Sequence, residues 1–218
     1  MKKSIALFDI DKTIILKDSM FLFVLFGIKR RPISVFILIP LIFYTVLFKL
    51  KLISVEKVKE YYFYHIKYLN EEDLREFFNM LINKYISQKA VNEMKEKKDQ
   101  GYYILLVTAS PYAYLQFFKE FPFVDEVIGT NLVSENNKYL NKVEGRNCKG
   151  EEKVIRIKEH LKERNIEIDY EDSCAYSDSL SDLPMMSLVK YKYLINHKNK
   201  HAKKQNSQYE IEDLIWDS

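Results

Sequence analysis

Short runs of apolar residues alternate along the chain with longer segments in which apolar residues recur every three or four positions. Four runs have the length and composition of strands buried on both faces of a sheet: 4–9, 102–108, 173–178 and 191–196. The spacing over 54–98 and 151–165 is typical of helices with one buried face. Strands that alternate with helices predict an α/β fold with a doubly wound, mostly parallel sheet, of which 191–196 is the last strand.

Two segments in the second half of the chain give more local predictions. The sequence "SPYAYLQFFKEF" predicts a helix with Ser110 as its N-cap and Pro111 in its first turn. The sequence "DEVIGTNLVSENNKYLNKVEG", 125–145, predicts a strand followed by a hairpin that turns at "ENNK". Both segments lie where connections between strands of the sheet are expected.

A long apolar insertion follows the first strand. Residues 33–48 carry no charge and are interrupted only by Pro40. A helix over these residues would be about 24 Å long, which is short for the bilayer core of about 30 Å. We expect a catalytic core formed by 1–17 and 90–218, and an inserted α-helical cap over 18–89.

Composition excludes several classes of protein. A net charge of +3 over 218 residues is too small to argue for nucleic acid as a partner. The first aspartates interrupt the N-terminal apolar stretch too early for a secretory signal. Cys148 and Cys174 belong to no CxxC pair, so we expect both to be reduced thiols in the cytoplasm. His197 and His201 are four residues apart but lie in a basic, polar stretch that is typical of a solvated loop rather than a metal site.

Acidic and hydroxyl side chains follow three of the predicted strands: Asp9 and Asp11, Thr108 and Ser110, and Asp178 and Asp182. The carboxyl ends of parallel strands meet at one edge of a sheet, where the sites of such folds lie. Each pair alone is explained by a turn or a helix cap. Carboxylates that converge repel each other, and a hard divalent cation such as Mg²⁺ removes that cost. This grouping suits phosphoryl transfer to a carboxylate, followed by hydrolysis of the acyl phosphate.

Four ordered motifs carry a resemblance to a known family: "DIDKT" at 9–13, "VTAS" at 107–110, a lysine within "CKGEEKV" at 148–154, and "YSDSLSD" at 176–182. In this order they resemble the haloacid-dehalogenase-like (HAD) hydrolase superfamily, subfamily IB, in its phosphoserine-phosphatase-like branch. The resemblance implies a Rossmann-like core, a helical cap and a Mg²⁺-dependent phosphatase.

The resemblance also implies a role for each motif residue. Asp9 would be the nucleophile, and Asp11 would donate and accept the proton. Mg²⁺ would be held by Asp9, the backbone carbonyl of Asp11 and Asp178. Asp182 would orient water or the motif lysine.

Further residues would bind the substrate. Thr108, with the backbone N–H groups of Ala109 and Ser110, would hold the phosphate oxygens. Asp18 falls where phosphoserine phosphatases have a substrate-contacting glutamate, so it would face the leaving group. The lysine is either Lys149 or Lys153, and Lys153 is favoured because an apolar residue, Ile157, follows it by four.

Lys12 departs from the family, in which glycine is common at that position. We expect its side chain to point away from the metal and give it no catalytic role.

The cap bears on the substrate. Its apolar stretch is flanked by "KRR" before and "KLK" after, and it is similar to the cap of the phosphatidylglycerophosphatase C family. That similarity implies a lipid phosphate such as phosphatidylglycerol phosphate. The basic flanks favour a segment 20–53 that lies at the cytoplasmic face of an anionic membrane, and the alternative is that its apolar residues pack within the cap. Two alternatives stay open: a soluble phosphatase for a small metabolite such as phosphoserine, and a catalytically silent membrane-binding module.

Overall fold

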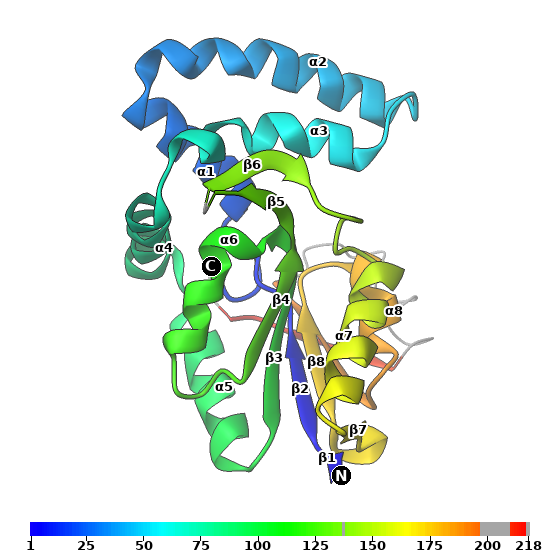
Figure 1. The fold of residues 1–218 in the computed structure, drawn as a ribbon. Helices are drawn as coiled ribbons and strands as arrows, with labels where there is room; N and C mark the ends of the chain where they lie inside the picture. The colour runs from blue at the N-terminus through cyan, green and yellow to red at the C-terminus, as the bar shows by residue number, and fades with distance from the viewer. Residues whose placement is uncertain (137, 197–209, 217–218) are drawn as a thin grey trace.

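A computed structural model describes residues 1–136, 138–196 and 210–216; the predicted loop containing His197 and His201 lies outside these ranges. Its centre is a six-stranded, wholly parallel sheet in the order β10-β9-β8-β2-β3-β4. The strands are β2 (Ile5–Phe8), β3 (Tyr103–Pro111), β4 (Glu126–Thr130), β8 (Cys174–Ser177), β9 (Tyr191–Ile195) and β10 (Ile211–Leu214). The architecture in Figure 1 confirms the predicted α/β fold with its helical insertion.

The central strand β2 is completely buried, as its unbroken apolar sequence predicts. Phe8 is in register with Leu106 of β3 and Tyr176 of β8. The N–H of Asp9 then donates to the carbonyl of Tyr176 at 2.9 Å, which fixes Asp9 directly beyond the strand. The carboxyl ends of β2, β3 and β8 are therefore neighbours.

Alternate residues of the strands face two apolar layers. Ala6 and Phe8 belong to a large cluster that also contains residues of α1 (Ser19–Arg30), α4 (Glu71–Tyr85), α5 and α6. Ile5 and Leu7 belong to a second cluster beneath α7 and α8. The helices on these two sides are α5 (Gln88–Asp99), α6 (Tyr112–Leu115), α7 (Glu151–Glu163) and α8 (Leu183–Met186). Figure 1 shows α5 and α6 on one side of the sheet and α7 and α8 on the other.

Shorter elements complete this body. A two-stranded parallel sheet joins β1 (Lys2–Lys3) to β7 (Glu167–Ile168). The connections also contain the 3-10 helices η3 (Gln116–Glu120), η4 (Tyr170–Asp172) and η5 (Leu180–Asp182).

The cap lies beyond the carboxyl edge of the sheet (Figure 1). It contains α1 (Ser19–Arg30), η1 (Pro32–Ile37), α2 (Leu38–Lys49), α3 (Val55–Tyr62), η2 (Tyr64–Tyr68) and α4 (Glu71–Tyr85). The antiparallel hairpin β5 (Leu132–Glu135) and β6 (Lys138–Val143) packs beneath α3, and the Asn141 amide donates to the carbonyl of Glu60 at 2.7 Å. The cap is thus fastened to the hairpin as well as to its two chain connections.

Helix α1 anchors the cap by close packing. Phe23 is fully buried and its ring lies 5.1 Å from both Phe77 and Tyr114. A Cβ on Gly27 would come within 2.1 Å of the His65 ring, so only glycine lets η2 approach α1 this closely. Helix α4 belongs to the predicted cap but also packs on α6 of the predicted core. The boundary between cap and core at 18–89 therefore stays a prediction.

Several sequence-based predictions need correction. The strand β3 continues through Ser110 to Pro111, which pairs with Thr130, so Ser110 is no N-cap and α6 begins only at Tyr112. Strand 191–196 is not the last, because β10 adds at the edge beside it. The uncharged segment 33–48 forms no continuous α-helix: it divides into η1 and α2.

Candidate active site

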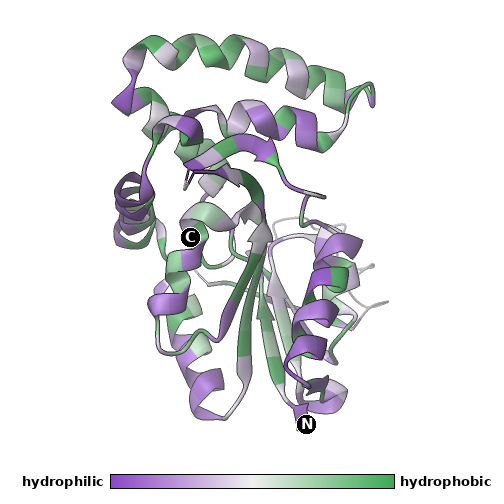
Figure 2. Ribbon diagram, viewed as in Figure 1, coloured by the Kyte–Doolittle hydropathy of each residue, from purple (hydrophilic) through white to green (hydrophobic). Residues whose placement is uncertain are grey.

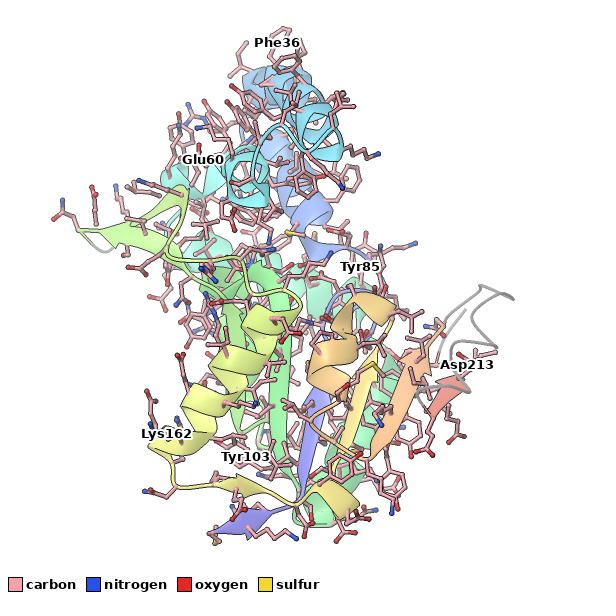
Figure 3. The ribbon with its side chains drawn as sticks, turned by 90° about the vertical axis from the view of Figure 1, so that its right-hand side faces the viewer. Phe36, Glu60, Tyr85, Tyr103, Lys162 and Asp213 are labelled. Carbon is pink, nitrogen blue, oxygen red and sulfur yellow. The ribbon has the colours of Figure 1, made fainter. Side chains whose placement is uncertain are left out.

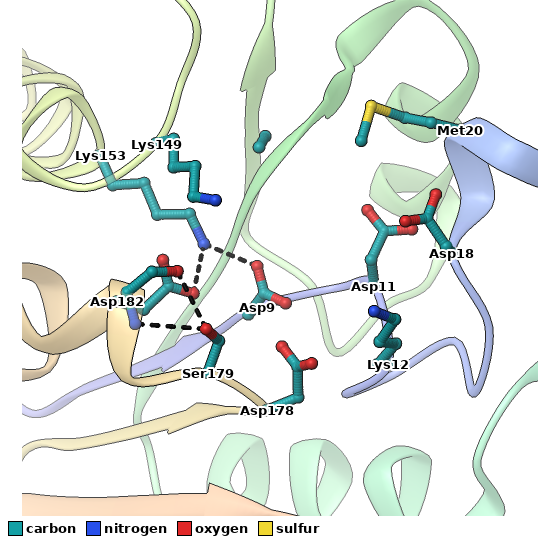
Figure 4. Close-up of a pocket in the computed structure, with 12 residues that line it drawn as sticks. Asp9, Asp11, Lys12, Asp18, Met20, Lys149, Lys153, Asp178, Ser179 and Asp182 are labelled. Atoms are coloured by element: carbon teal, nitrogen blue, oxygen red, sulfur yellow. Dashed lines mark hydrogen bonds and ion pairs between the residues drawn. The ribbon is translucent and has the colours of Figure 1, made fainter. Parts of the chain in front are cut away.

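A cavity of about 170 Å³ opens at the carboxyl edge of β2 and β8, below the start of α1. Figure 4 shows its lining side chains, most of which are charged or polar. They are Asp9, Asp11, Lys12, Asp18, Met20, Ala109, Lys149, Lys153, Asp178, Ser179, Ser181 and Asp182. The fold therefore brings together acids that are up to 173 positions apart in the sequence.

Lys153 makes the central contacts of this cavity. From the first turn of α7, its Nζ lies 2.6 Å from Asp9 Oδ1 and 2.8 Å from Asp182 Oδ2. Asp182 also accepts a hydrogen bond from Ser177 Oγ at 2.8 Å. Lys149, the other candidate, lines the same cavity, but Lys153 is the lysine that contacts the predicted nucleophile.

The charge states of this pair follow from their surroundings. Burial raises the pKa of Asp9, and the neighbouring Lys153 ammonium opposes that shift. Burial alone would lower the pKa of Lys153, but the charges of Asp9 and Asp182 outweigh it and raise that pKa. Since the ammonium is firmly held and lies 2.6 Å away, we treat Asp9 as a carboxylate.

Asp11 lies in a separate group of hydrogen bonds. Its carboxylate accepts from Ser110 Oγ at 2.5 Å and from the N–H of Ser19 at 2.6 Å, with Thr108 Oγ1 at 3.3 Å. Burial raises its pKa, and these donors offset part of that rise. A carboxyl group with a raised pKa next to a cavity is suited to carry a proton.

Thr108 and Ser110, in the segment predicted to bind phosphate, contact Asp11 through their side chains. Thr108 Oγ1 and Ser110 Oγ both donate to Asp11, and the N–H of Ser110 donates to Thr108 Oγ1 at 3.0 Å. Neither residue lines the cavity, whereas Ala109 between them does. The structure thus places this segment around Asp11, because it is an extended part of β3 rather than the start of a helix.

Asp178, Asp18 and Lys12 complete the rim. The carboxylates of Asp9 and Asp178 point toward a common space in Figure 4, and burial raises the pKa of Asp178. Asp18 caps α1 by accepting from the N–H of Phe21 at 3.0 Å and also lines the cavity. Lys12, expected to point away, lines the cavity instead; it has a φ of 61°, a conformation that glycine adopts readily.

Sequence reasoning missed two groups that support the site. Ser19 connects α1 to the core, because its Oγ lies 3.1 Å from Ser110 Oγ and 3.2 Å from the hydroxyl of Tyr114. Its place directly after Asp18 is the one signal that could have indicated it.

Lys59 is the second group. It is buried, extends from α3 of the cap, and donates to the carbonyl of Ala109 and to Asn147 Oδ1. Burial lowers its pKa to about 8. A lysine in an amphipathic helix is normally assigned to the solvated face, so no sequence signal distinguishes it.

The donors fit a hard divalent cation. Within 1–136, 138–196 and 210–216, no three His, Cys, Asp or Glu side chains cluster as metal ligands. The predicted set needs only two carboxylates, Asp9 and Asp178, with the carbonyl of Asp11, and Mg²⁺ characteristically keeps several waters. Because burial raises the pKa of both carboxyls, a cation between them would stabilise their ionised forms.

Both cysteines, Cys148 and Cys174, are buried as free thiols. They lie outside the cavity lining, and burial raises the pKa of each to about 11. Neither thiol is therefore placed or ionised to act as a nucleophile in this cavity.

Comparisons with known proteins identify the family and the fold. Residues 6–187 match the family described as haloacid dehalogenase-like hydrolase. Protein CicA from Caulobacter vibrioides strain NA1000 is 29% identical over 120 residues, which are 55% of this chain and 52% of CicA. The alignment thus spans about half the length of the curated relatives it matches.

Solved structures share the fold over nearly the whole chain. A Bordetella pertussis Tohama I protein of unknown function has a TM-score of 0.79 at 18% identity, covering 98% of this chain and 99% of its own. A phosphoserine phosphatase described as a phospho-aspartyl intermediate analogue has a TM-score of 0.64 at 20% identity, and the match covers 97% of this chain and 93% of the phosphatase. A substrate-bound phosphoserine phosphatase complex has a TM-score of 0.65 at 19% identity, and the match covers 94% of this chain and 91% of the phosphatase.

Proposed function

The chain belongs to the haloacid dehalogenase-like hydrolase family, and from that premise we propose that it hydrolyses phosphomonoesters through a phosphoaspartyl intermediate on Asp9. The observation that carries this proposal is the buried Asp9 carboxylate, held by Lys153 at 2.6 Å and facing a small charged cavity. The ion pair fixes the orientation of Asp9 through Oδ1. The other oxygen, Oδ2, has only a long contact of 3.5 Å with Thr13 Oγ1 among the hydrogen bonds of the described residues. A carboxylate so placed is suited to attack phosphorus.

The first half of the reaction transfers the phosphoryl group. An oxygen of Asp9 attacks phosphorus, the bond to the ester oxygen breaks, and Asp11 gives its proton to that leaving oxygen. Lys153 stabilises the negative charge shared by Asp9 and the phosphoryl oxygens. Asp182 positions Lys153 for this task.

The second half restores the enzyme. Asp11, now ionised, takes a proton from water, and the water oxygen attacks phosphorus. The bond between phosphorus and Asp9 breaks, so inorganic phosphate leaves and both carboxyl groups return to their starting states. The hydroxyls of Thr108 and Ser110 and the N–H of Ser19 stabilise ionised Asp11 between the two halves.

Mg²⁺ is the cofactor we propose. Asp9, the carbonyl of Asp11 and Asp178 would hold it, and when bound it would neutralise charge on the transferring phosphoryl group. Five aspartates but only three lysines are among the residues that line the cavity, and a divalent cation would correct this excess of negative charge.

We favour a small phosphomonoester as the substrate. The cavity is about 170 Å³ and is lined by charged groups of both signs, such as Asp18 and Lys149, whereas Met20 and Ala109 are its only apolar lining residues in the described part of the chain. These properties suit a compact, polar leaving group. Phosphoserine is the first compound to test, since solved phosphoserine phosphatases share this fold.

A lipid phosphate such as phosphatidylglycerol phosphate is the second candidate. Its support is the exposed apolar surface of helix α2 in the cap. Helix α1, about 18 Å long, separates Asp18 at the cavity from the far end of the cap, so a lipid headgroup would have to leave the bilayer interface to reach Asp9.

A panel of substrates tests the proposal. Phosphate release is measured from an aryl phosphate, phosphoserine and phosphatidylglycerol phosphate in mixed micelles, with Mg²⁺ and with EDTA. We expect Mg²⁺-dependent release that Asp9→Asn removes and Asp172→Asn, a change at an exposed distant acid, leaves intact. Release from none of the three, or release unchanged in Asp9→Asn, would contradict it and favour the silent membrane-binding module.

A further inference from the structure

The outermost surface of the cap is apolar, and we propose that it docks on an anionic membrane. This outer cap face consists of nine side chains on η1, α2 and the turn after them, each between 43% and 75% exposed. They are Ile33, Val35, Phe36, Ile39, Ile42, Phe43, Val46, Leu50 and Leu52. Figure 2 shows α2 as a largely hydrophobic helix at the far end of the molecule, and Figure 3 places Phe36 beyond Glu60 of α3.

The spacing of these residues makes the face continuous. Ile39, Phe43 and Val46 follow one another at intervals of four and three, which places them along one side of α2. Phe36 of η1 and Leu50 after α2 extend the stripe at its two ends. The opposite side of α2 packs on α3, where Tyr44 stacks on Tyr61 with ring centroids 4.2 Å apart. An unbroken apolar stripe on a soluble surface indicates a binding face.

The segment lies along the membrane rather than across it. Pro32–Lys49 has a mean hydropathy of 2.0, with 6% of it buried, and is the one candidate span among the described residues. A single crossing would separate β2 from β3 and β8, yet β2 pairs with both. Helix α3 returns alongside α2, and its Lys59 contacts Ala109 of the core. The face can therefore enter only the interface of one leaflet.

Charge identifies the kind of membrane. The segment 19–55 contains five basic residues and no acid, whereas the whole chain carries +3, so the rest of the chain sums to −2. Lys29, Arg31, Lys49 and Lys51 are exposed at the two ends of the outer cap face. Arg30 is engaged by Asp73 and Glu76 and is not counted. A basic rim around an apolar face matches an anionic lipid surface.

The same charges argue against a second copy of the chain as the occupant. Two copies packed face to face would bring rims of like charge together, which is destabilising in the absence of acids on this face. Docking also does not depend on hydrolysis. The Asp9→Asn protein should bind membranes as the parent does, so failure of one proposal leaves the other testable.

Flotation with vesicles tests the docking. The full chain is mixed with vesicles of phosphatidylcholine alone or of equal parts phosphatidylcholine and phosphatidylglycerol. We expect binding to the anionic vesicles that weakens at high salt. Ile42→Glu should reduce binding at least about tenfold, whereas Ile215→Glu, at an exposed isoleucine far along the chain, should not change it. Both positions are exposed, so neither change should prevent folding.

Substitutions of basic residues form the second part of the flotation experiment. Lys29→Gln and Lys49→Gln should each weaken binding about fivefold on anionic vesicles, and Lys162→Gln on α7 should have no effect. Absence of binding to either vesicle would overturn the proposal, as would equal binding to both. A dimer in sedimentation that Ile42→Glu dissociates, together with no vesicle binding, would overturn it in favour of a second copy.

Discussion

The edge of the sheet and the outer cap face depart in opposite ways from the usual distribution of residues. At the edge, charged groups are buried: Asp9 is 7% exposed and Lys153 is 1% exposed. On the outer cap face, large apolar groups are in water, and Ile42 is 65% exposed. Buried charges and exposed apolar patches are the two unusual arrangements that soluble proteins normally avoid.

The two departures differ in how they are compensated. The buried charges are partnered within the chain, by the Lys153 ion pairs and by the donors around Asp11. The outer cap face has no such partner in the described part of the chain, and only Leu41 of η1 and α2 is buried. Buried charges that are paired within the chain are typical of a preorganised reaction site. An exposed apolar face is typical of a surface that binds a partner outside the chain.

The largest effect should come from the nucleophile. Asp9→Asn removes the attacking carboxylate, and we expect the loss of about 10⁴-fold or more in kcat. Steady-state kinetics with an aryl phosphate measures it, with Asp172→Asn as the matched control. Activity within about tenfold of the parent would remove Asp9 from its proposed role.

Substitution of Lys153 should have the second-largest effect. Lys153→Met leaves Asp9 and Asp182 buried without their cation, and we expect about 3 kcal/mol less stability with at least about 10²-fold lower kcat. Denaturant unfolding and kinetics measure the two effects. Lys149→Met on the cavity rim is the control, and a larger loss there would transfer the motif role to Lys149.

Packing inside the cap provides a test on the apolar side of the comparison. Phe23→Ala removes a fully buried ring that contacts Phe77 and Tyr114, so we expect a loss of about 3–5 kcal/mol. Phe43→Ala removes a ring that is 58% exposed, and we expect a change below about 0.5 kcal/mol. Equal losses in urea unfolding would show that the outer cap face is covered within the protein.

The stability of the fold should depend on pH through His65 in the cap. Burial lowers the pKa of His65 to about 4, and its buried Nδ1 has no hydrogen-bond partner among the described residues. The unfolded state therefore binds a proton between about pH 6.5 and 4 that the folded state does not, and stability falls as pH decreases through that window. Thermal unfolding at both limits should show a smaller pH dependence in His65→Gln than in the parent, and an unchanged dependence would exclude His65.

The sequence predicted the sheet because β2 is an unbroken apolar run, β8 is mostly apolar, and an acid directly follows each strand. The antiparallel hairpin was also predicted correctly on either side of "ENNK", of which Asn137 is outside the described residues. Periodicity alone missed the continuation of β3 through Ser110 to Pro111, because a serine followed by proline is equally suited to begin a helix.

The candidate site was predicted as far as local motifs reach. The convergence of Asp9, Asp178 and Asp182 follows from parallel strands that end at one edge. Lys153 lies on α7 and was indicated only by the resemblance to the family. The contacts of Ser19 and Lys59 arise from how the cap packs on the core, and no spacing within the sequence encodes that packing. The role of each residue in catalysis stays a prediction.

Chemical trapping of the intermediate is the most direct test of the central claim. The Asp11→Asn protein, in which water activation is slowed, is incubated with Mg²⁺ and an aryl phosphate, quenched, and reduced with borohydride, which converts an aspartyl phosphate to homoserine. Peptide mass spectrometry should find homoserine at position 9. Homoserine at position 11 or 178, or turnover with Asp9 unreduced under conditions that trap the intermediate of a phosphoserine phosphatase, would contradict the account.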